Sequence, residues 1–181
     1  MGQYYRVVLK QNGKTVVYNR NIDGKYTMAK LMEHSWWENS LLKAIGKKLY
    51  KKKGRLAWVG DYAEDAELEK IHMKVEDVWG SEDREVKGQG LRSVSFMFDN
   101  KYLCNHTKKK YIDLKAYYTE CVNDGWCINP LSLLCAIGNG KGGGDYSGIG
   151  EDLVGDWAWD EISIEDTSPD DYLLSDITFI E

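Results

Sequence analysis

The first twenty residues contain two short apolar runs separated by a polar turn sequence. Residues 3–10 and 15–20 are rich in Tyr and Val, and Asn12-Gly13 lies between them. This pattern predicts a β-hairpin with a two-residue turn. Residues 41–53 instead repeat Leu and Ile at helical spacing, end in lysines and meet Gly54, which predicts an amphipathic helix with a glycine stop.

The same reasoning along the remaining chain predicts further elements. The predicted helices are 28–34, capped by Thr27, 114–122, capped by Asp113, and 131–138, which follows Pro130. The predicted strands are 55–62, a hairpin of 92–98 and 101–105, and two C-terminal strands over 157–165 and 172–180. The charged segment 63–79 fits either a helix or an irregular excursion. Mixed elements without strict βαβ alternation predict an α+β fold, a single domain over 1–181 with a mainly antiparallel sheet that both chain ends join.

Charge divides this chain sharply. Residues 1–141 hold all 24 basic residues against 17 acids, whereas residues 142–181 hold twelve acids and no Lys or Arg. The two parts therefore carry +7 and −12, which gives the net charge of −5. A glycine-rich loop over 138–150 joins the basic part to the acidic, β-rich C-terminal part. The negative field of the acidic part attracts basic surfaces and repels nucleic acid.

The acidic segment interleaves its carboxylates with large apolar residues, which is typical of a strand with one wet face. One interpretation is a solvated edge that discourages aggregation, and another is internal pairing with the basic part. A sharper hypothesis is a carboxylate array that docks a basic protein, with tryptophans as anchors. The predicted partner-binding residues are Asp156, Trp157, Trp159, Asp160, Asp166, Asp170 and Asp171.

The glycine-rich loop offers a second hypothesis. Serial glycines let backbone amides approach an anion, so the loop could bind a small phosphorylated ligand or nucleotide. The candidate ligand-binding residues are Gly140, Lys141, Gly142, Gly143, Gly144 and Asp145. The loop matches neither a Walker motif nor a dinucleotide fingerprint, and acids follow it directly. The alternative is a structural loop that needs positive φ or close packing.

Catalytic and metal-binding signatures are weak. His34, His72 and His106 match no hydrolase or zinc-protease motif, so a small hydrolase is only a third alternative. The four cysteines lack zinc-finger spacing, and no metal or cofactor is expected. The lysine run 47–55 could bind nucleic acid, but the net negative charge of the chain makes this the less expected option. The run could equally contact the acidic segment of a second copy in a homo-oligomer. Without an apolar leader or membrane span, the cytoplasm is expected.

Four segments carry a resemblance to a known group of proteins: 1-MGQYY-5, 33-EHSWW-37, 57-AWVGDYA-63 and 138-GNGKGGGDYSGIGEDLVGDWAWDEISIED-166. With these the chain resembles a family of small uncharacterised proteins from phages and mobile elements of gram-positive gut bacteria. The resemblance implies a non-enzymatic counter-defence inhibitor in the cytoplasm of a bacterial host, similar to anti-CRISPR proteins. Its target would be a basic, nucleic-acid-handling host protein such as an RNA-guided CRISPR nuclease, which holds nucleic acid in positively charged channels.

Overall fold

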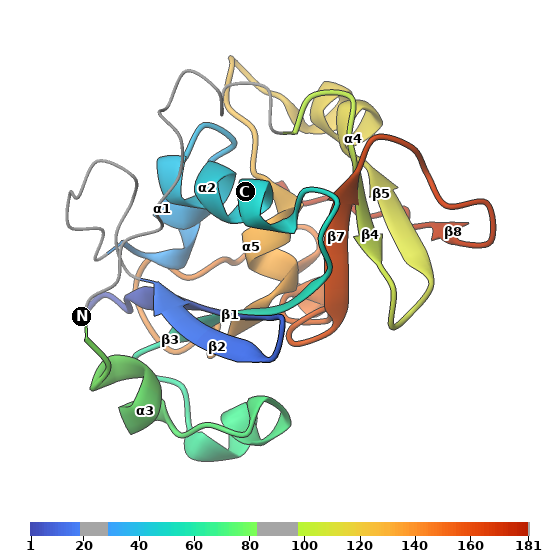
Figure 1. Ribbon diagram of the computed structural model, residues 1–181. Helices are drawn as coiled ribbons and strands as arrows, with labels where there is room; N and C mark the ends of the chain where they lie inside the picture. The colour runs from blue at the N-terminus through green and yellow to red at the C-terminus, as the bar shows by residue number, and fades with distance from the viewer. Residues whose placement is uncertain (19–28, 83–97, 181) are drawn as a thin grey trace.

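The computed structural model describes residues 1–18, 29–82 and 98–180 (Figure 1). The strands are β1 (Tyr5–Gln11), β2 (Lys14–Tyr18), β3 (Gly54–Gly60), β4 (Tyr102–Asn105), β5 (Lys110–Asp113), β6 (Ala136–Ile137), β7 (Glu161–Glu165) and β8 (Leu173–Leu174). The α-helices are α1 (Leu31–Ser35), α2 (Ser40–Leu49), α3 (Val75–Trp79), α4 (Leu114–Cys121) and α5 (Pro130–Leu134), and the 3₁₀ helices are η1 (Asp65–Ile71) and η3 (Glu151–Leu153).

One eight-stranded sheet organises the domain in the order β2-β1-β3-β7-β4-β5-β8, with β6 pairing β3 off this path. The pairs β3–β6 and β5–β8 are parallel and the other pairs are antiparallel. The α+β class and the mainly antiparallel sheet predicted from the sequence are therefore confirmed. The N-terminal strand β1 lies inside the sheet, and the C-terminal strand β8 forms one of its edges.

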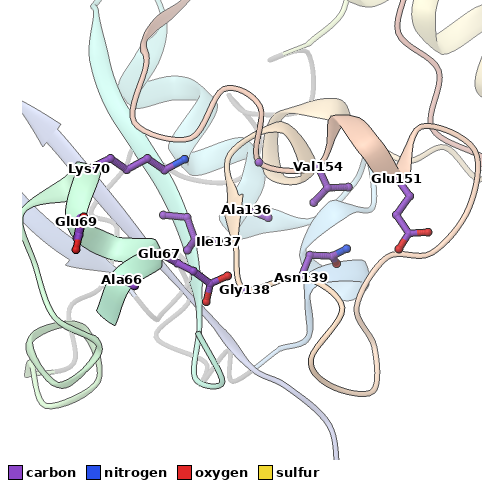
Figure 2. A pocket seen from close by; sticks show the side chains of 11 residues that line it. Ala66, Glu67, Glu69, Lys70, Ala136, Ile137, Gly138, Asn139, Glu151 and Val154 are labelled. Atoms are coloured by element: carbon purple, nitrogen blue, oxygen red, sulfur yellow. The ribbon is translucent and has the colours of Figure 1, made fainter. Parts of the chain in front are cut away.

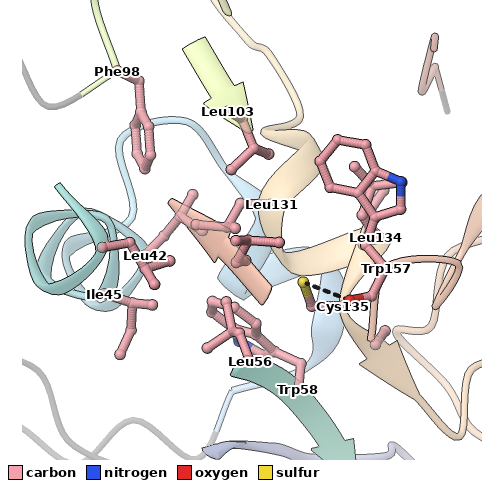
Figure 3. Packing of buried hydrophobic residues seen from close by; sticks show 14 of the residues in the cluster. Leu42, Ile45, Leu56, Trp58, Phe98, Leu103, Leu131, Leu134, Cys135 and Trp157 are labelled. Atoms are coloured by element: carbon pink, nitrogen blue, oxygen red, sulfur yellow. Dashed lines mark hydrogen bonds between the residues drawn. The ribbon is translucent and has the colours of Figure 1, made fainter. Parts of the chain in front are cut away.

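Alternating side chains of β1 and β3 enter two separate cores. Val7 of β1 and Trp58 of β3 belong to the larger hydrophobic cluster, which also takes residues of α1, α2 and α5. Figure 3 shows Trp58 in this cluster, and Figure 1 shows these helices over one side of the sheet. Val8 and Val59 point to the opposite face and pack with η1 and α3 in a smaller cluster. Because strand side chains alternate between faces, a strand covered on both sides reads as continuously apolar. This explains the run of buried residues from Tyr5 to Leu9.

Local capping explains where the helices begin. The Asn39 side chain accepts hydrogen bonds from the first amides of α2, and Asp113 does the same for α4. Asn129 caps α5, whose first residue is Pro130. These side chains satisfy amides that a helix start leaves without partners. The predicted cap at Asp113 and the predicted place of Pro130 in the first turn of a helix are thus confirmed. Two predicted helices are too long: α2 ends at Leu49 rather than at 53, and α5 ends at Leu134 rather than at 138, because residues 136–137 form β6 and pair with β3.

The C-terminal strand predictions are wrong in extent. Residues 151–160 form a 3₁₀ turn and further turns, so β7 begins only at Glu161 rather than at 157. Within 172–180 only Leu173–Leu174 forms a strand, although Ile180 makes an isolated bridge to Ile149. Trp159 has a φ of 66°. That left-handed residue turns the chain and prevents a continuous strand through the 157–160 segment.

Two other predictions need separate treatment. β4 pairs with β5 through the turn 106–109, so residues 101–105 belong to a different hairpin from the one predicted. The other predicted arm, residues 92–97, lies outside the described residues, as do Thr27 and Met28 at the start of the predicted helix 28–34. The ambiguous segment 63–79 forms η1 and α3, which together cover the smaller core.

Candidate functional site

The glycine-rich loop already holds an anion, and that anion is its own carboxylate. The amides of Lys141 and Gly142 donate to Asp145 Oδ2 at 2.8 and 2.9 Å. The Tyr5 hydroxyl donates to Asp145 Oδ1 at 3.0 Å, and burial together with the Asp145 charge raises the pKa of this phenol. The Lys141 and Gly142 amides, which a phosphate would need as donors, therefore already bond to Asp145. The Asp145 carboxylate likewise has its hydrogen-bond partners within the protein.

The lysine and the glycines of this loop also have internal roles. Lys141 Nζ pairs with Glu64 at 2.9 Å and Glu67 at 2.7 Å, which raises the pKa of the lysine. Gly143 bridges the N-terminus: its amide donates to Met1 and its carbonyl accepts from Gln3. A Cβ on Gly142 would lie 2.5 Å from the Gln3 Cβ. The loop thus clasps the first residues of the chain, which agrees with the structural alternative.

A cavity of about 870 Å³ lies beside the start of this loop, between η1 and β6 (Figure 2). Glu67 and Glu69 line one side, and Asn139 and Glu151 line the other. Lys70 is the base among the described lining residues. Carboxylates outnumber bases on its wall, so the cavity repels phosphate groups.

The predicted partner-binding carboxylates are mostly paired with lysines of the basic part. Asp156 lies 2.6 Å from Lys108 Nζ, and Asp160 lies 3.8 Å from the same nitrogen. Asp160 also accepts from the Asn105 amide at 2.8 Å. Asp171 lies 3.3 Å from Lys109 Nζ. The two oppositely charged parts of the sequence therefore meet in space, as the internal-pairing interpretation predicted.

Asp166 makes the densest of these contacts. Lys51 and Lys101 lie 2.6 and 2.7 Å from its carboxylate, and the Tyr50 hydroxyl donates to both oxygens at 2.9 Å. Hydrogen bonds from Lys101, Lys51 and Tyr50 hold the pKa of Asp166 below its ordinary value. Asp170, in contrast, is exposed and has no ion pair with a described residue. It alone of the five predicted acids presents an uncompensated charge.

Both predicted tryptophan anchors are core residues. Trp157 is 1% exposed and Trp159 is 7% exposed. Trp157 packs in the larger cluster, where its carbonyl lies 4.0 Å from the Cys135 sulfur (Figure 3). Trp159 packs in the smaller cluster. Neither ring is accessible to a partner, so their assignment as surface anchors is corrected: the turns of 151–160 direct both side chains inward.

The structure does place a serine beside a histidine. His106 Nε2 lies 2.8 Å from Ser163 Oγ, and His106 Nδ1 lies 2.8 Å from the Tyr172 hydroxyl. Ser163 donates its proton to Glu165 at 2.6 Å, and its side chain is fully buried. A nucleophile needs access to substrate and a base that accepts its proton. This network meets neither condition; instead it fastens Tyr172, and so β8, to the sheet.

A site that sequence reasoning missed lies where the turn 123–126 meets the end of α1. Trp36 is 45% exposed and Trp126 is 63% exposed, and their ring centroids are 5.3 Å apart at an interplanar angle of 68°. Both line a pocket of about 330 Å³. We call these two rings and this pocket the tryptophan corner. Its other described lining residues are Met32, Cys121, Asn123, Asp124, Cys127, Ile128, Phe179 and Ile180.

The sequence contained one signal for this corner. Trp36 and Trp37 are adjacent, and only Trp37 is buried. Adjacent side chains point in different directions, so a Trp-Trp pair favours one buried ring and one at the surface. The partner ring, Trp126, follows Asp124-Gly125, a turn dipeptide that predicts an exposed loop tip. Their proximity could not be predicted, because 90 positions separate them along the chain.

Neither family models, nor curated proteins, nor solved structures give a match to this chain. The resemblance to phage proteins therefore stays a prediction. Over residues 1–18, 29–82 and 98–180, no three His, Cys, Asp or Glu side chains gather in a way that could hold a metal ion. No helix in these ranges combines the length and apolar character needed to cross a bilayer.

Proposed function

We propose that this chain is a non-enzymatic binding protein that docks a basic protein partner, with the tryptophan corner as its anchor. The observation that carries the proposal is the exposure of two large aromatic rings at the mouth of one pocket. Tryptophan is the residue most enriched among side chains that dominate binding energy, and exposed apolar patches mark interaction sites. The apolar surface continues at Ile180 and at Ile149, its bridge partner.

Charge supports a basic partner. Asp124 lines the corner, and none of the described lining residues is basic. The exposed Glu120 lies near the lining residue Cys121, and burial and, to a lesser extent, the Glu120 charge raise the pKa of that thiol. Acidic groups around an apolar anchor speed encounter with a basic surface and suppress other partners. The predicted acidic array thus contributes less to partner binding than the sequence suggests, because lysines neutralise most of its carboxylates. At the corner, no base among the described lining residues neutralises Asp124.

The host protein that the phage resemblance implies, an RNA-guided nuclease, belongs to this class of partner. Such nucleases bind nucleic acid in positively charged channels. An acidic ligand that occupies such a channel or its rim would compete with nucleic acid. We propose inhibition of such a nucleic-acid-handling protein as the biological outcome of the binding.

The test is binding to a panel of purified basic proteins, RNA-guided nucleases among them, measured by calorimetry and by nuclease assay. We expect the Trp36→Ala/Trp126→Ala double variant to lose binding by at least tenfold, since a hot-spot truncation costs about 2 kcal/mol or more. The matched control is Leu173→Ala/Leu174→Ala, which removes two exposed apolar side chains from β8, outside the corner. If the wild-type chain binds no basic protein, or if the double variant binds unchanged, the proposal is wrong.

The alternative of a phosphorylated ligand at the glycine-rich loop loses its support in this geometry. Asp145 occupies the amides of Lys141 and Gly142, and the adjacent cavity is lined mainly by carboxylates. A ligand that binds only the folded state raises the melting temperature by mass action. We therefore expect no shift with nucleotides or phosphate.

A further inference from the structure

The tryptophan corner has the shape of a cation site. Its two indole rings are in edge contact, with centroids 5.3 Å apart and planes at 68°, and both rings line one pocket. The face of an aromatic ring carries the negative part of its quadrupole, and tryptophan attracts cations more strongly than tyrosine or phenylalanine does. A cation that enters this pocket therefore meets indole surface.

The floor and the electrostatics of the corner suit a weakly hydrated cation. Met32, Ile128 and Phe179 contribute apolar surface to the pocket, and Asp124 contributes a carboxylate. Cys127 also lines it, and burial raises the pKa of this thiol to about 12, so it stays neutral. The described lining therefore carries one negative charge. A primary ammonium would lose water there without gaining enough acceptors, whereas an N-methylated ammonium gives up little hydration.

Backbone hydrogen bonds hold the main-chain segments that carry both rings. Asn123 and Trp126 exchange amide–carbonyl hydrogen bonds of 2.8 and 2.7 Å. Between them Asp124 and Gly125 have φ of 47° and 81°, the left-handed pair of a type I′ turn. Trp36 forms a bridge with Ile128, and its carbonyl accepts from the Asn39 amide. A backbone that is already hydrogen-bonded reduces the free energy that binding loses to ordering these segments.

We propose that the tryptophan corner receives the alkylammonium head of a lysine side chain on the basic partner, with N-methylated lysine as the preferred form. This inference rests on the proposed function for the identity of the partner as a basic protein. The corner's own chemistry, indole surface and one carboxylate beside apolar lining residues, selects the group. The stem of the lysine packs along the apolar rim, while its charged head lies in the pocket against the indole surface.

The experiment uses the full chain and four peptides of one basic sequence that differ only at the central position. That position is trimethyllysine, lysine, acetyllysine, or the neutral carbon isostere of trimethyllysine, and calorimetry gives the dissociation constants. We expect trimethyllysine to bind most tightly and the carbon isostere to bind about tenfold more weakly, because the two differ only in charge. Equal affinity for these two peptides, or no binding of any peptide, would overturn the cation assignment.

Two variants locate the site. Trp126→Leu keeps an apolar side chain but removes one π face, so it should reduce the preference for trimethyllysine over the isostere. Asp124→Asn removes the charge but tolerates the left-handed backbone, so it should weaken binding and flatten its salt dependence. The melting temperature controls for folding. A preference unchanged by Trp126→Leu in a folded protein contradicts the assignment.

The two proposals can fail separately. If a basic protein binds through Trp36 and Trp126 but the four peptides bind alike, the corner is an apolar anchor and only the cation assignment fails. If the trimethyllysine preference is present but no basic protein binds, the site exists and the proposed function fails.

Discussion

The glycine-rich loop and the tryptophan corner contrast in how far the fold satisfies its own groups. In the loop, the lysine, the acid and several amides have internal partners: Asp145 accepts from Lys141 and Gly142, while Lys141 pairs with Glu67. In the corner, Trp36 is 45% exposed and Trp126 is 63% exposed, and both lie on hydrogen-bonded backbone. A sequence motif that suggests ligand binding can thus have its polar groups satisfied by internal hydrogen bonds, whereas residues outside any motif can remain exposed to solvent.

The largest expected difference in stability is between two tryptophan variants, one at a buried ring and one at the exposed corner. Trp157→Ala should lower the free energy of unfolding by about 3–5 kcal/mol, because it removes a fully buried ring from the larger core. Trp126→Ala should lower it by less than about 1 kcal/mol, since most of that ring is in water. Urea unfolding of both variants gives the two values. Similar losses would show that the corner is part of the core.

Next in size is a glycine pair within the loop. Gly142→Ala should destabilise the fold by about 1–3 kcal/mol, because the new Cβ would lie 2.5 Å from the Gln3 Cβ and 2.9 Å from the Gln3 amide nitrogen. Gly143→Ala is the matched control, with its nearest neighbour, the Met1 carbonyl oxygen, at 3.5 Å. Its unfolding free energy should stay within about 0.5 kcal/mol of the wild type. Equal stabilities would contradict the clasp of the N-terminus by this loop.

The carboxylate in the loop should matter as a structural anion. Asp145→Asn weakens the charge-assisted hydrogen bonds from two amides and from Tyr5, at an expected cost of about 1–2 kcal/mol. Asp152→Asn, at an exposed carboxylate, serves as the control and should be nearly silent. Thermal unfolding with and without phosphate distinguishes the roles. If Asp145→Asn creates a phosphate-dependent rise in melting temperature, the loop is an anion site that the aspartate normally blocks.

A smaller effect comes from the network that fastens β8. Burial, and secondarily Lys53, lowers the pKa of His106 below its ordinary 6.5 in the folded state. The unfolded chain therefore binds more protons between the folded pKa and 6.5, so stability rises with pH across that window and falls as the pH drops through it. His106→Gln should reduce this pH dependence, whereas His72→Gln, at an exposed site, should leave it unchanged. Melting temperatures from pH 5 to 8 give the comparison.

Local chemistry in the sequence was sufficient for several elements. Asn12-Gly13 fixes the β1–β2 turn because both residues adopt positive φ, and Asp113 caps α4 through its own side chain. These features depend on neighbours within a few positions. The strand prediction for residues 157–160 was wrong although it identified the buried residues correctly, because the backbone there forms turns. Trp157 and Trp159 are buried as a strand pattern suggests, yet they reach opposite cores from consecutive turns.

The sequence by itself determined the α+β class, the first hairpin and the division into a basic and an acidic part, because composition, periodicity and turn chemistry act locally. Only the tertiary structure decided which charges remain free and which aromatic rings remain exposed. Asp166 meets Lys51 and Lys101 across more than sixty positions, and Trp36 meets Trp126 across ninety. Long-range proximity follows from how the sheet and helices pack, and this packing places the acids beside lysines while leaving the tryptophan corner open to a partner.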